Sequence, residues 1–212
     1  MNDKLIEYAK KEVMNDEYGR LSLSTRKKLW SEFKIQYKKD PWDVYKTKDF
    51  IKKYTLALSC IQKTSYLWNG YNIEASDILK NLITSIGKYL HEFIPEKEFH
   101  DICFSAQTII QDVDSSVIDY MAICYAVLDL ANIIMSGESR VEKDYIDDGV
   151  NDDELDFNCW DTSYLISLFY WSIQDEDKNI RIEKSREYWL WYIDKFVEIY
   201  NSNEFEDLET VK

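Results

Sequence analysis

Glycine and proline are scarce in this chain: five glycines and two prolines occur among 212 residues. A β-meander or β-sandwich needs a tight turn about every ten residues, and glycine or proline commonly supplies the backbone geometry of such turns. The shortage therefore disfavours both architectures and favours a helical fold.

Apolar residues recur at helical spacing in eight segments, and no stretch shows sustained alternation of period two. Ser24 or Thr25 is a candidate cap for the second helix, which we expect to end at Asp40 because a following proline disfavours the α conformation. The sixth helix is apolar on most sides, which is typical of a helix in the middle of a bundle. The predicted helices span residues 2–13, 24–40, 47–68, 76–93, 95–111, 116–136, 162–172 and 179–200.

The chain is long and apolar enough to form a sizeable core. Hydrophobic residues make up 45% of the sequence, with seven tryptophans and sixteen tyrosines, and a chain of this length buries roughly 70% of the surface that its unfolded form exposes. We predict one compact all-α domain over residues 1–200, followed by an acidic, frayed tail over residues 201–212. Two subdomains divided at residues 138–161 are the alternative.

The four cysteines are widely separated, with no CxxC pair, and three lie within apolar periodic runs. We expect free thiols that act as small buried hydrophobic residues. Residues 1–13 mix charged with apolar residues, which indicates a helix rather than a signal peptide. The most apolar stretch, residues 120–135, contains Asp129 and Asn132 and is shorter than the ~18 residues of a membrane span. These features predict a cytoplasmic protein that does not enter the membrane.

Charge is distributed unevenly along the sequence. The net charge is −14, yet residues 1–53 contain fourteen basic and nine acidic residues. The connection before the last two helices, residues 138–161, holds ten acidic residues and two basic ones. So negative a protein repels nucleic acid and attracts basic proteins. Acidic loops also occur in proteins where they serve solubility alone, which is the alternative role for residues 138–161.

No pattern in the sequence predicts a catalytic or metal site. His100 and Asp101 form a His-Asp doublet, but metal-dependent phosphohydrolases also need a distant upstream histidine, and His91 lies only nine residues away. A calcium loop with Gly149 at its sixth position would have Ile146 and Leu155 where carboxylates are required. Gly-rich phosphate loops and Glu-x-x-His pairs are missing as well. We therefore expect neither catalysis nor a cofactor.

An aromatic cluster lies in the last predicted helix, formed by Tyr188, Trp189, Trp191 and Tyr192. We interpret it mainly as a core-facing surface, with Trp189 buried and Arg186 paired with an acidic neighbour such as Asp161. The other interpretation is that one or two rings reach the surface as binding anchors, because Trp and Tyr dominate interface hot spots.

Motifs near both ends of the chain point to a family. The first is Gly19-Arg20-Leu21-Ser22-Leu23, followed by Arg26 and Leu29-Trp30. The second is Trp160-Asp161-Thr162-Ser163, followed by an arginine before an aromatic-Trp-x-Trp-Tyr run, residues 186–192. Together they resemble the opening and closing motifs of an all-helical family of immunity proteins from bacterial polymorphic toxin systems. The resemblance implies a structural role for Arg26, Trp30, Trp160, Asp161, Arg186, Trp189 and Trp191.

The resemblance also implies a function. Such proteins bind the toxic domain of a cognate toxin and protect the producing cell. Many of these domains are basic nucleases, to which an acidic inhibitor is attracted, and occlusion requires no chemistry from the inhibitor. The alternatives are a non-catalytic helical adaptor or regulator of another basic host protein, and an enzyme with an unrecognised carboxylate site.

We expect the acidic connection to form part of the binding surface, because its charge is concentrated and aromatic residues occur within it. Its carboxylates should lie outside the apolar core, so that fold stability barely depends on them. The predicted partner-binding residues are Asp147, Asp148, Asp152, Asp153, Glu154 and Asp156, with Tyr145 and Phe157 as apolar anchors.

Overall fold

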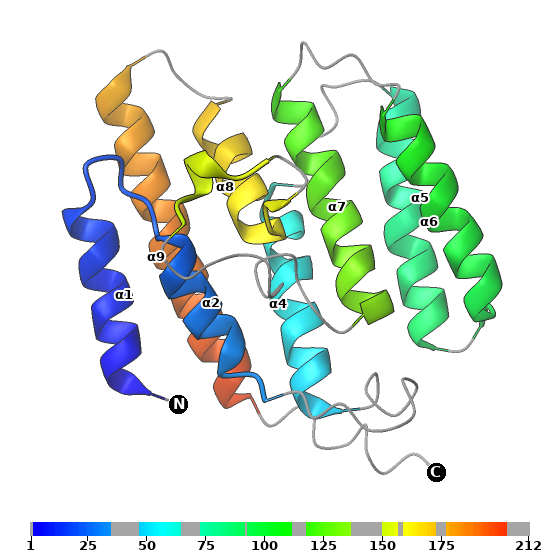
Figure 1. The fold of residues 1–212 in the computed structure, drawn as a ribbon, viewed down its shortest axis with the longest axis horizontal. Coiled ribbons are helices and arrows are strands. Elements are labelled where there is room, and N and C mark those ends of the chain that lie inside the picture. The colour runs from blue at the N-terminus through cyan, green and yellow to red at the C-terminus, as the bar shows by residue number, and fades with distance from the viewer. Residues whose placement is uncertain are drawn as a thin grey trace.

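The computed structural model describes residues 2–34, 47–64, 73–91, 93–111, 118–136, 150–156, 159–172 and 177–202. This part of the chain is 83% helical and contains no strand, which confirms the predicted all-α domain. Its elements are α1 (Asp3–Asn15), α2 (Leu23–Ser31), α4 (Lys48–Thr64), α5 (Ile73–Leu90), α6 (Glu96–Gln111), α7 (Ile118–Ser136), the short 3-10 helix η3 (Asp152–Glu154), α8 (Thr162–Ser172) and α9 (Lys178–Asn201) (Figure 1).

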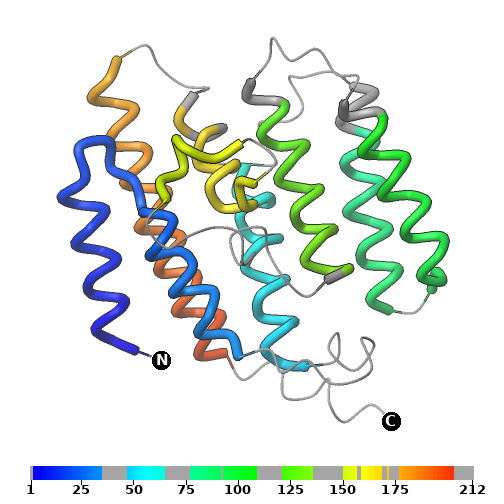
Figure 2. The backbone as a smooth tube through the Cα atoms, viewed as in Figure 1, coloured from blue at the N-terminus to red at the C-terminus, as the bar shows by residue number. Residues whose placement is uncertain are grey.

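The helices lie side by side in an order that differs from their order in the sequence (Figures 1 and 2). Helix α9 packs against α1, α4 and α8, so the last helix adjoins the first. Helices α4 and α8 pack on α7, and the pair α5 and α6 packs on the other side of α7. Helix α7 thus has neighbours on both sides, and Ala126–Ala131 are all buried. The sixth predicted helix accordingly has the central position expected from its apolar surface.

Aromatic side chains join the N-terminal and C-terminal helices in the core. Among the described residues, Trp30 and Trp189 are the largest fully buried side chains. The Phe33 ring lies 5.1 Å from that of Phe196 and 6.1 Å from that of Tyr200. Burial of each large apolar side chain stabilises the fold by about 1.5–3 kcal/mol, so these rings contribute strongly to holding α2 against α9.

Several helix ends differ from the predicted ones. Ser22 caps α2, since its hydroxyl accepts from the Thr25 amide at 3.3 Å, and the helix begins at Leu23. It ends at Ser31, where the amides of Glu32 and Phe33 bond to carbonyls three residues back and tighten the last turn. The predicted end at Asp40, and that of the third predicted helix at residue 68, lie outside the described residues. Helix α5 starts three residues before the predicted Ser76.

Buried polar groups at the start of α8 are matched by a carboxylate from α7. Asp129 Oδ2 lies 2.8 Å from both the amide nitrogen and the Oγ1 of Thr162. The side chain that interrupts the apolar run of the sixth predicted helix therefore accepts hydrogen bonds from the first residue of α8. This arrangement satisfies one of the amides that the first turn of a helix leaves without an intrahelical partner.

The four cysteines are free thiols; Cys60, Cys103 and Cys124 are buried, and Cys159 is partly buried. The burial of three of them agrees with their predicted role as small core residues. None of the helices in the described ranges combines the length and apolar character needed to cross a membrane.

Candidate functional site

The turn between α1 and α2 is held by Asp16. Its Oδ1 accepts hydrogen bonds from the amides of Tyr18 at 2.9 Å and Arg20 at 2.8 Å. Gly19 then adopts a φ of 67°. A Cβ at Gly19 would lie 2.6 Å from Arg186 Cγ and 2.8 Å from the Ile182 carbonyl oxygen. Because both the conformation and the close approach favour glycine, this turn packs its backbone directly on α9.

Two side chains of α9 fasten the same turn. Ser185 Oγ donates to the Gly19 carbonyl at 3.0 Å, and Arg186 Nη2 donates to the Asp16 carbonyl at 3.3 Å. Arg186 therefore bonds to the backbone of the α1–α2 turn rather than to Asp161, which differs from our expectation. The turn packs directly against Arg186, whereas Asp161 already pairs with another arginine.

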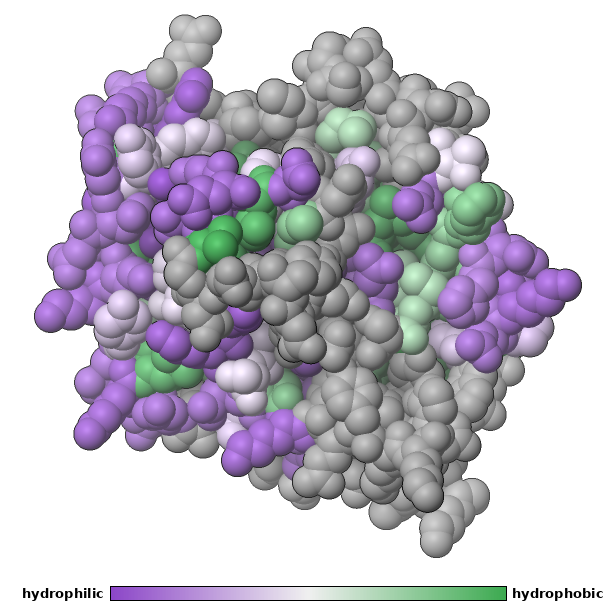
Figure 3. Space-filling model, viewed as in Figure 1, coloured by the Kyte–Doolittle hydropathy of each residue, from purple (hydrophilic) through white to green (hydrophobic). Residues whose placement is uncertain are grey.

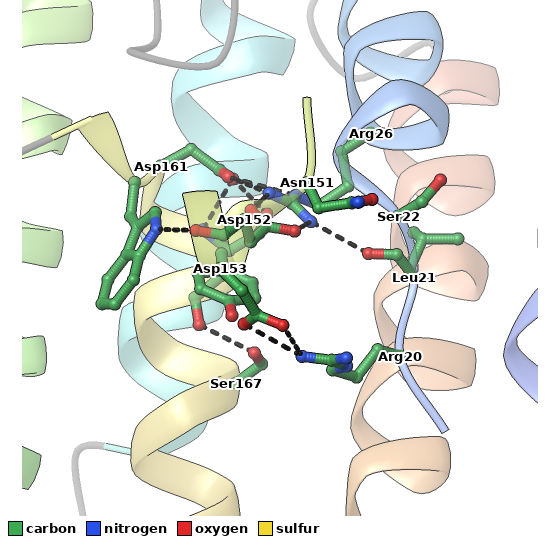
Figure 4. Close-up of polar contacts among 12 residues, drawn as sticks. Arg20, Leu21, Ser22, Arg26, Asn151, Asp152, Asp153, Asp161 and Ser167 are labelled. Carbon is green, nitrogen blue, oxygen red and sulfur yellow. Dashed lines mark hydrogen bonds and ion pairs between the residues drawn. The ribbon is translucent and has the colours of Figure 1, made fainter. Parts of the chain in front are cut away.

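That arginine is Arg26, which is fully buried in the first half of α2. Its Nε and Nη2 lie 3.1 and 3.0 Å from Asp161 Oδ1. Its Nη1 and Nη2 donate to the two oxygens of Asp152 at 3.0 and 2.5 Å, and Nη1 also donates to the Leu21 carbonyl at 2.9 Å (Figure 4). Every nitrogen of the guanidinium thus has an oxygen partner, which a buried charge requires.

The electrostatics of this cluster keep Arg26 charged. Burial by itself lowers the pKa of Arg26, but the carboxylates of Asp161 and Asp152 outweigh burial, and the pKa is raised. The guanidinium also lies over aromatic rings, with Cζ 5.0 Å from the Tyr164 centroid and 5.5 Å from that of Trp189. Such cation–π contacts add to the ion pairs.

The cluster joins three segments that are distant in the sequence: α2, η3 and the start of α8. Trp160 Nε1 donates to the Asp152 carbonyl at 2.8 Å, which adds a second attachment for η3. Asp161 Oδ2 accepts from both the amide and the hydroxyl of Ser163. With Asp152 directed inward, the next residue faces outward: Asp153 has a side chain 67% exposed and contacts Arg20 Nη1 at 3.3 Å through both oxygens.

A cleft of about 320 Å³ lies where these segments meet, and we name it the α1–η3 cleft. Five of its lining residues are acidic and one is basic. It contains no histidine or cysteine, and within the described ranges no group of three or more His, Cys, Asp or Glu side chains is placed to hold a metal ion. The lining residues are Glu12, Asp16, Arg20, Leu21, Ser22, Leu23, Asn151, Asp152, Asp153 and Glu154.

The family model for Immunity protein Imm5 matches residues 6–199, which is nearly the whole chain. The chain belongs to the Imm5 immunity protein family. A comparison with curated proteins found no match.

The motif residues of the Imm5 chain are buried or partly buried. The structure brings the opening and closing motifs together, since the arginine of the first pairs with the aspartate of the second. The fully buried members are Arg26, Trp30, Asp161 and Trp189. The partly buried members are Trp160, Arg186 and Trp191.

The predicted partner-binding residues fall into three groups. Asp153, Glu154 and Asp156 are exposed. Asp152 is buried against Arg26, so the expectation that it lies outside the core was wrong. Its ion pair with a buried guanidinium explains this position. The members that lie outside the described residues are Asp147, Asp148, Tyr145 and Phe157.

Sequence reasoning missed the wall of the cleft that α1 provides. Glu12 lies in the last turn of α1 and Asp16 directly follows the helix, so acidic residues at this helix end were a signal. What the local sequence does not reveal is that this end meets η3, which lies more than 130 residues later in the sequence.

Proposed function

We propose that this Imm5 protein binds the toxic domain of a cognate toxin and neutralises it by covering its active surface, without catalysing a reaction. The observation that carries this proposal is the family match over residues 6–199. An immunity protein acts on a toxin, and the simplest inhibitory mechanism for a small helical protein is stoichiometric occlusion.

Charge supports a basic toxic domain as the partner. The chain has a net charge of −14. Five carboxylates line the α1–η3 cleft, of which Asp152 pairs with Arg26 and Asp153 pairs with Arg20, so the lining stays negative after both pairs are counted. A negative surface of this kind repels phosphate groups and attracts the cationic surface with which a nuclease holds its substrate. The acidic protein therefore competes for the same surface as nucleic acid.

The chemistry of the buried polar groups supports binding rather than catalysis. Arg26, Asp152 and Asp161 use their charges on one another. The thiol of Cys60 is fully buried, and burial raises its pKa to about 12, so the reactive thiolate is scarce near neutral pH. These groups act in folding and do not form an activated nucleophile.

The test uses the toxic domain encoded by the reading frame adjacent to this gene. Co-expression should restore growth of cells that produce the toxic domain, and the two purified proteins should form a complex. Titration of toxin activity should reach full inhibition at a one-to-one ratio, and active toxin should return when the complex is dissociated. Progressive inactivation by a small fraction of an equivalent would instead indicate catalysis and would contradict occlusion.

A further inference from the structure

We propose that the α1–η3 cleft, with Tyr8 and Tyr18 at its sides, receives a lysine or arginine side chain of the toxic domain. This inference rests on the proposed function and adds to it the place of contact and the chemistry recognised there. The apolar anchors predicted from the sequence were Tyr145 and Phe157, so Tyr8 and Tyr18 are a different set of contact residues.

Exposed apolar side chains are concentrated on α1, on the turn after it and at the start of α9. Of six large hydrophobic side chains exposed in the described part of the chain, four lie on α1, the turn after it, or the first turn of α9. Tyr8 is 55% exposed and lies one helical turn before Glu12, a wall of the cleft. Tyr18 is 37% exposed and contacts Arg20, another lining residue. The buried residues of α1 are Ala9 and Val13, so Tyr8 is not part of the core-facing surface of this helix.

Two cationic side chains of the protein itself already lie beside the Tyr18 ring and near carboxylates. Arg20 Cζ lies 4.8 Å from the centroid of the Tyr18 ring, and Lys178 Nζ lies 5.3 Å from it. Arg20 also pairs with Asp153, and Lys178 pairs with Glu17 at 3.6 Å. An aromatic face beside carboxylates is the arrangement that attracts guanidinium and ammonium groups. These surface pairs are weak, so a cation of the partner can compete for the same groups.

Exposed carboxylates of the cleft are the groups that a cation of the partner can reach. Asp153 and Glu154 are exposed. Glu12 Oε1 accepts from Ser22 Oγ at 2.8 Å, and Glu12 Oε2 is buried with no hydrogen bond from any described residue, so Glu12 adds negative charge to the wall but no open acceptor. The walls are rigidly placed, because Asp16 organises the turn and Arg26 fixes η3 through Asp152. Such preorganisation lowers the entropic cost of binding.

The opposite edge of the molecule exposes apolar residues without this charge. Phe93 and Phe104 are well exposed there, and Figure 3 shows hydrophobic side chains over α6 and α7 on the right of the view. The groove between α5 and α6 contains Lys88 together with Glu98 and Asp101, so cationic and anionic groups are more nearly balanced than in the α1–η3 cleft. This edge therefore does not select a basic partner, and it supplies matched controls.

The experiment measures binding of the full chain to the toxic domain encoded by the adjacent reading frame. The cleft variants are Tyr8→Ala, Tyr18→Ala, Tyr18→Phe and the double variant Asp153→Asn with Glu154→Gln. The control variants change the same chemistry at the α6 edge: Phe104→Ala, and Glu98→Gln with Asp101→Asn. Thermal midpoints of all variants are compared with the parent, since every altered side chain is exposed.

We expect Tyr18→Ala and the double cleft variant each to weaken binding by about tenfold or more, as truncation of interface anchors does. Tyr18→Phe should stay within about threefold of the parent because it keeps the ring face that a cation contacts. Control variants should bind like the parent. Hydrogen exchange in the complex should slow in residues 8–22 and 150–156 and stay unchanged in residues 93–108.

Other outcomes separate the two proposals. If the parent binds the toxic domain but the cleft variants bind equally well, or if only the α6 controls weaken binding, the cleft assignment is overturned and the immunity function stands. If the parent itself neither binds nor inhibits the toxic domain, the proposed function fails and the assigned occupant fails with it.

Discussion

A buried arginine is stable only if its charge is matched, and Arg26 meets this condition with two aspartates from different segments. The penalty for removing one partner of a buried ion pair comes mainly from the charge left behind without compensation. Here the loss of Arg26 would leave Asp161 fully buried and Asp152 nearly so. The residue therefore matters more for the position of η3 than an isolated ion pair would suggest.

We expect Arg26→Ala to lower the free energy of unfolding by about 3–5 kcal/mol. Urea denaturation measures this value. Arg20→Ala is the matched control, because it removes the exposed pair with Asp153 and should cost less than about 1 kcal/mol. Equal, small effects of the two substitutions would show that the Arg26 cluster contributes little to stability.

Buried thiols and phenols make stability depend on alkaline pH. Burial raises the pKa of Cys60 to about 12 and that of Cys103 to about 11, above the ordinary thiol value of 9.0. Burial likewise raises the pKa of Tyr188 and Tyr192 well above 10.0. Between the ordinary and the raised pKa values, the unfolded chain releases protons that the folded chain retains. The stability that these groups contribute is therefore fully present below pH 9 and is lost as pH rises toward 12.

Replacement of Cys60 tests this pH dependence. Each group that titrates only in the unfolded chain reduces stability by about 1.4 kcal/mol per pH unit. Cys60→Ala should therefore show a shallower loss of stability than the parent above pH 9, by about this slope. Denaturant unfolding at a series of pH values provides the comparison. Parallel losses in the two proteins would contradict a raised pKa at Cys60.

Single residues were predictable when local spacing determined their environment. Trp189 was expected to be buried from its place in a periodic aromatic run, and it is fully buried. Asp152 was expected at the surface because the residues around it are acidic. Its burial depends on Arg26, which lies 126 residues away, and no local pattern encodes a pair at that distance.

The turn between α1 and α2 shows what a short connection requires of its sequence. Gly19→Ala should lower the free energy of unfolding by about 1–3 kcal/mol, because alanine disfavours a positive φ and its Cβ would meet the backbone of α9. Gly87→Ala in α5 is the control. Apart from the neighbouring backbone of its own helix, no atom of the described residues lies within 4 Å of its added Cβ, so it should stabilise the protein by about 0.5–1 kcal/mol.

Thermal and denaturant unfolding of the two alanine variants measure these opposite effects. If both variants shift stability in the same direction, the glycine at position 19 is not required by the turn.

Helical periodicity predicted the elements well and their ends less well. The seventh predicted helix, residues 162–172, has the same bounds as α8, and the eighth differs from α9 by one residue at each end. Helix α2 ends at Ser31, before the predicted end, and Phe33 just beyond it packs against Phe196 and Tyr200 of α9. Periodic patterns report which face of a helix is apolar, but they do not determine the residue at which the helix ends.

At the scale of the whole molecule, charge and topology combine to make the α1–η3 cleft. The sequence indicated an acidic surface before the last two helices, and Asp153, Glu154 and Asp156 are exposed there. It did not indicate that α1 and the turn after it add Glu12 and Asp16 to the same surface, because residues 1–53 carry a net positive charge. In the folded chain, Glu12 and Asp16 of this net basic segment lie beside the acidic residues of η3 and together line the cleft.

Electrostatic attraction should make association with a basic toxic domain fast and sensitive to salt. The field of the exposed carboxylates reaches only about 8 Å near physiological ionic strength, so the association rate should fall as salt rises. The triple variant Asp153→Asn, Glu154→Gln and Asp156→Asn should associate more slowly at low salt and respond less to added salt. Its thermal midpoint should match that of the parent, since these three side chains are exposed.

The single variant Asp152→Asn separates steering from stability. It removes a charge from the same segment, but this carboxylate lies against the buried guanidinium of Arg26 at 2.5 Å. Its thermal midpoint should therefore fall, because a buried cation loses part of its compensation. Stopped-flow association at several salt concentrations, with melting curves of all three proteins, decides between these roles. A triple variant with the parent's rate and salt dependence would reduce the acidic residues of this surface to a role in solubility.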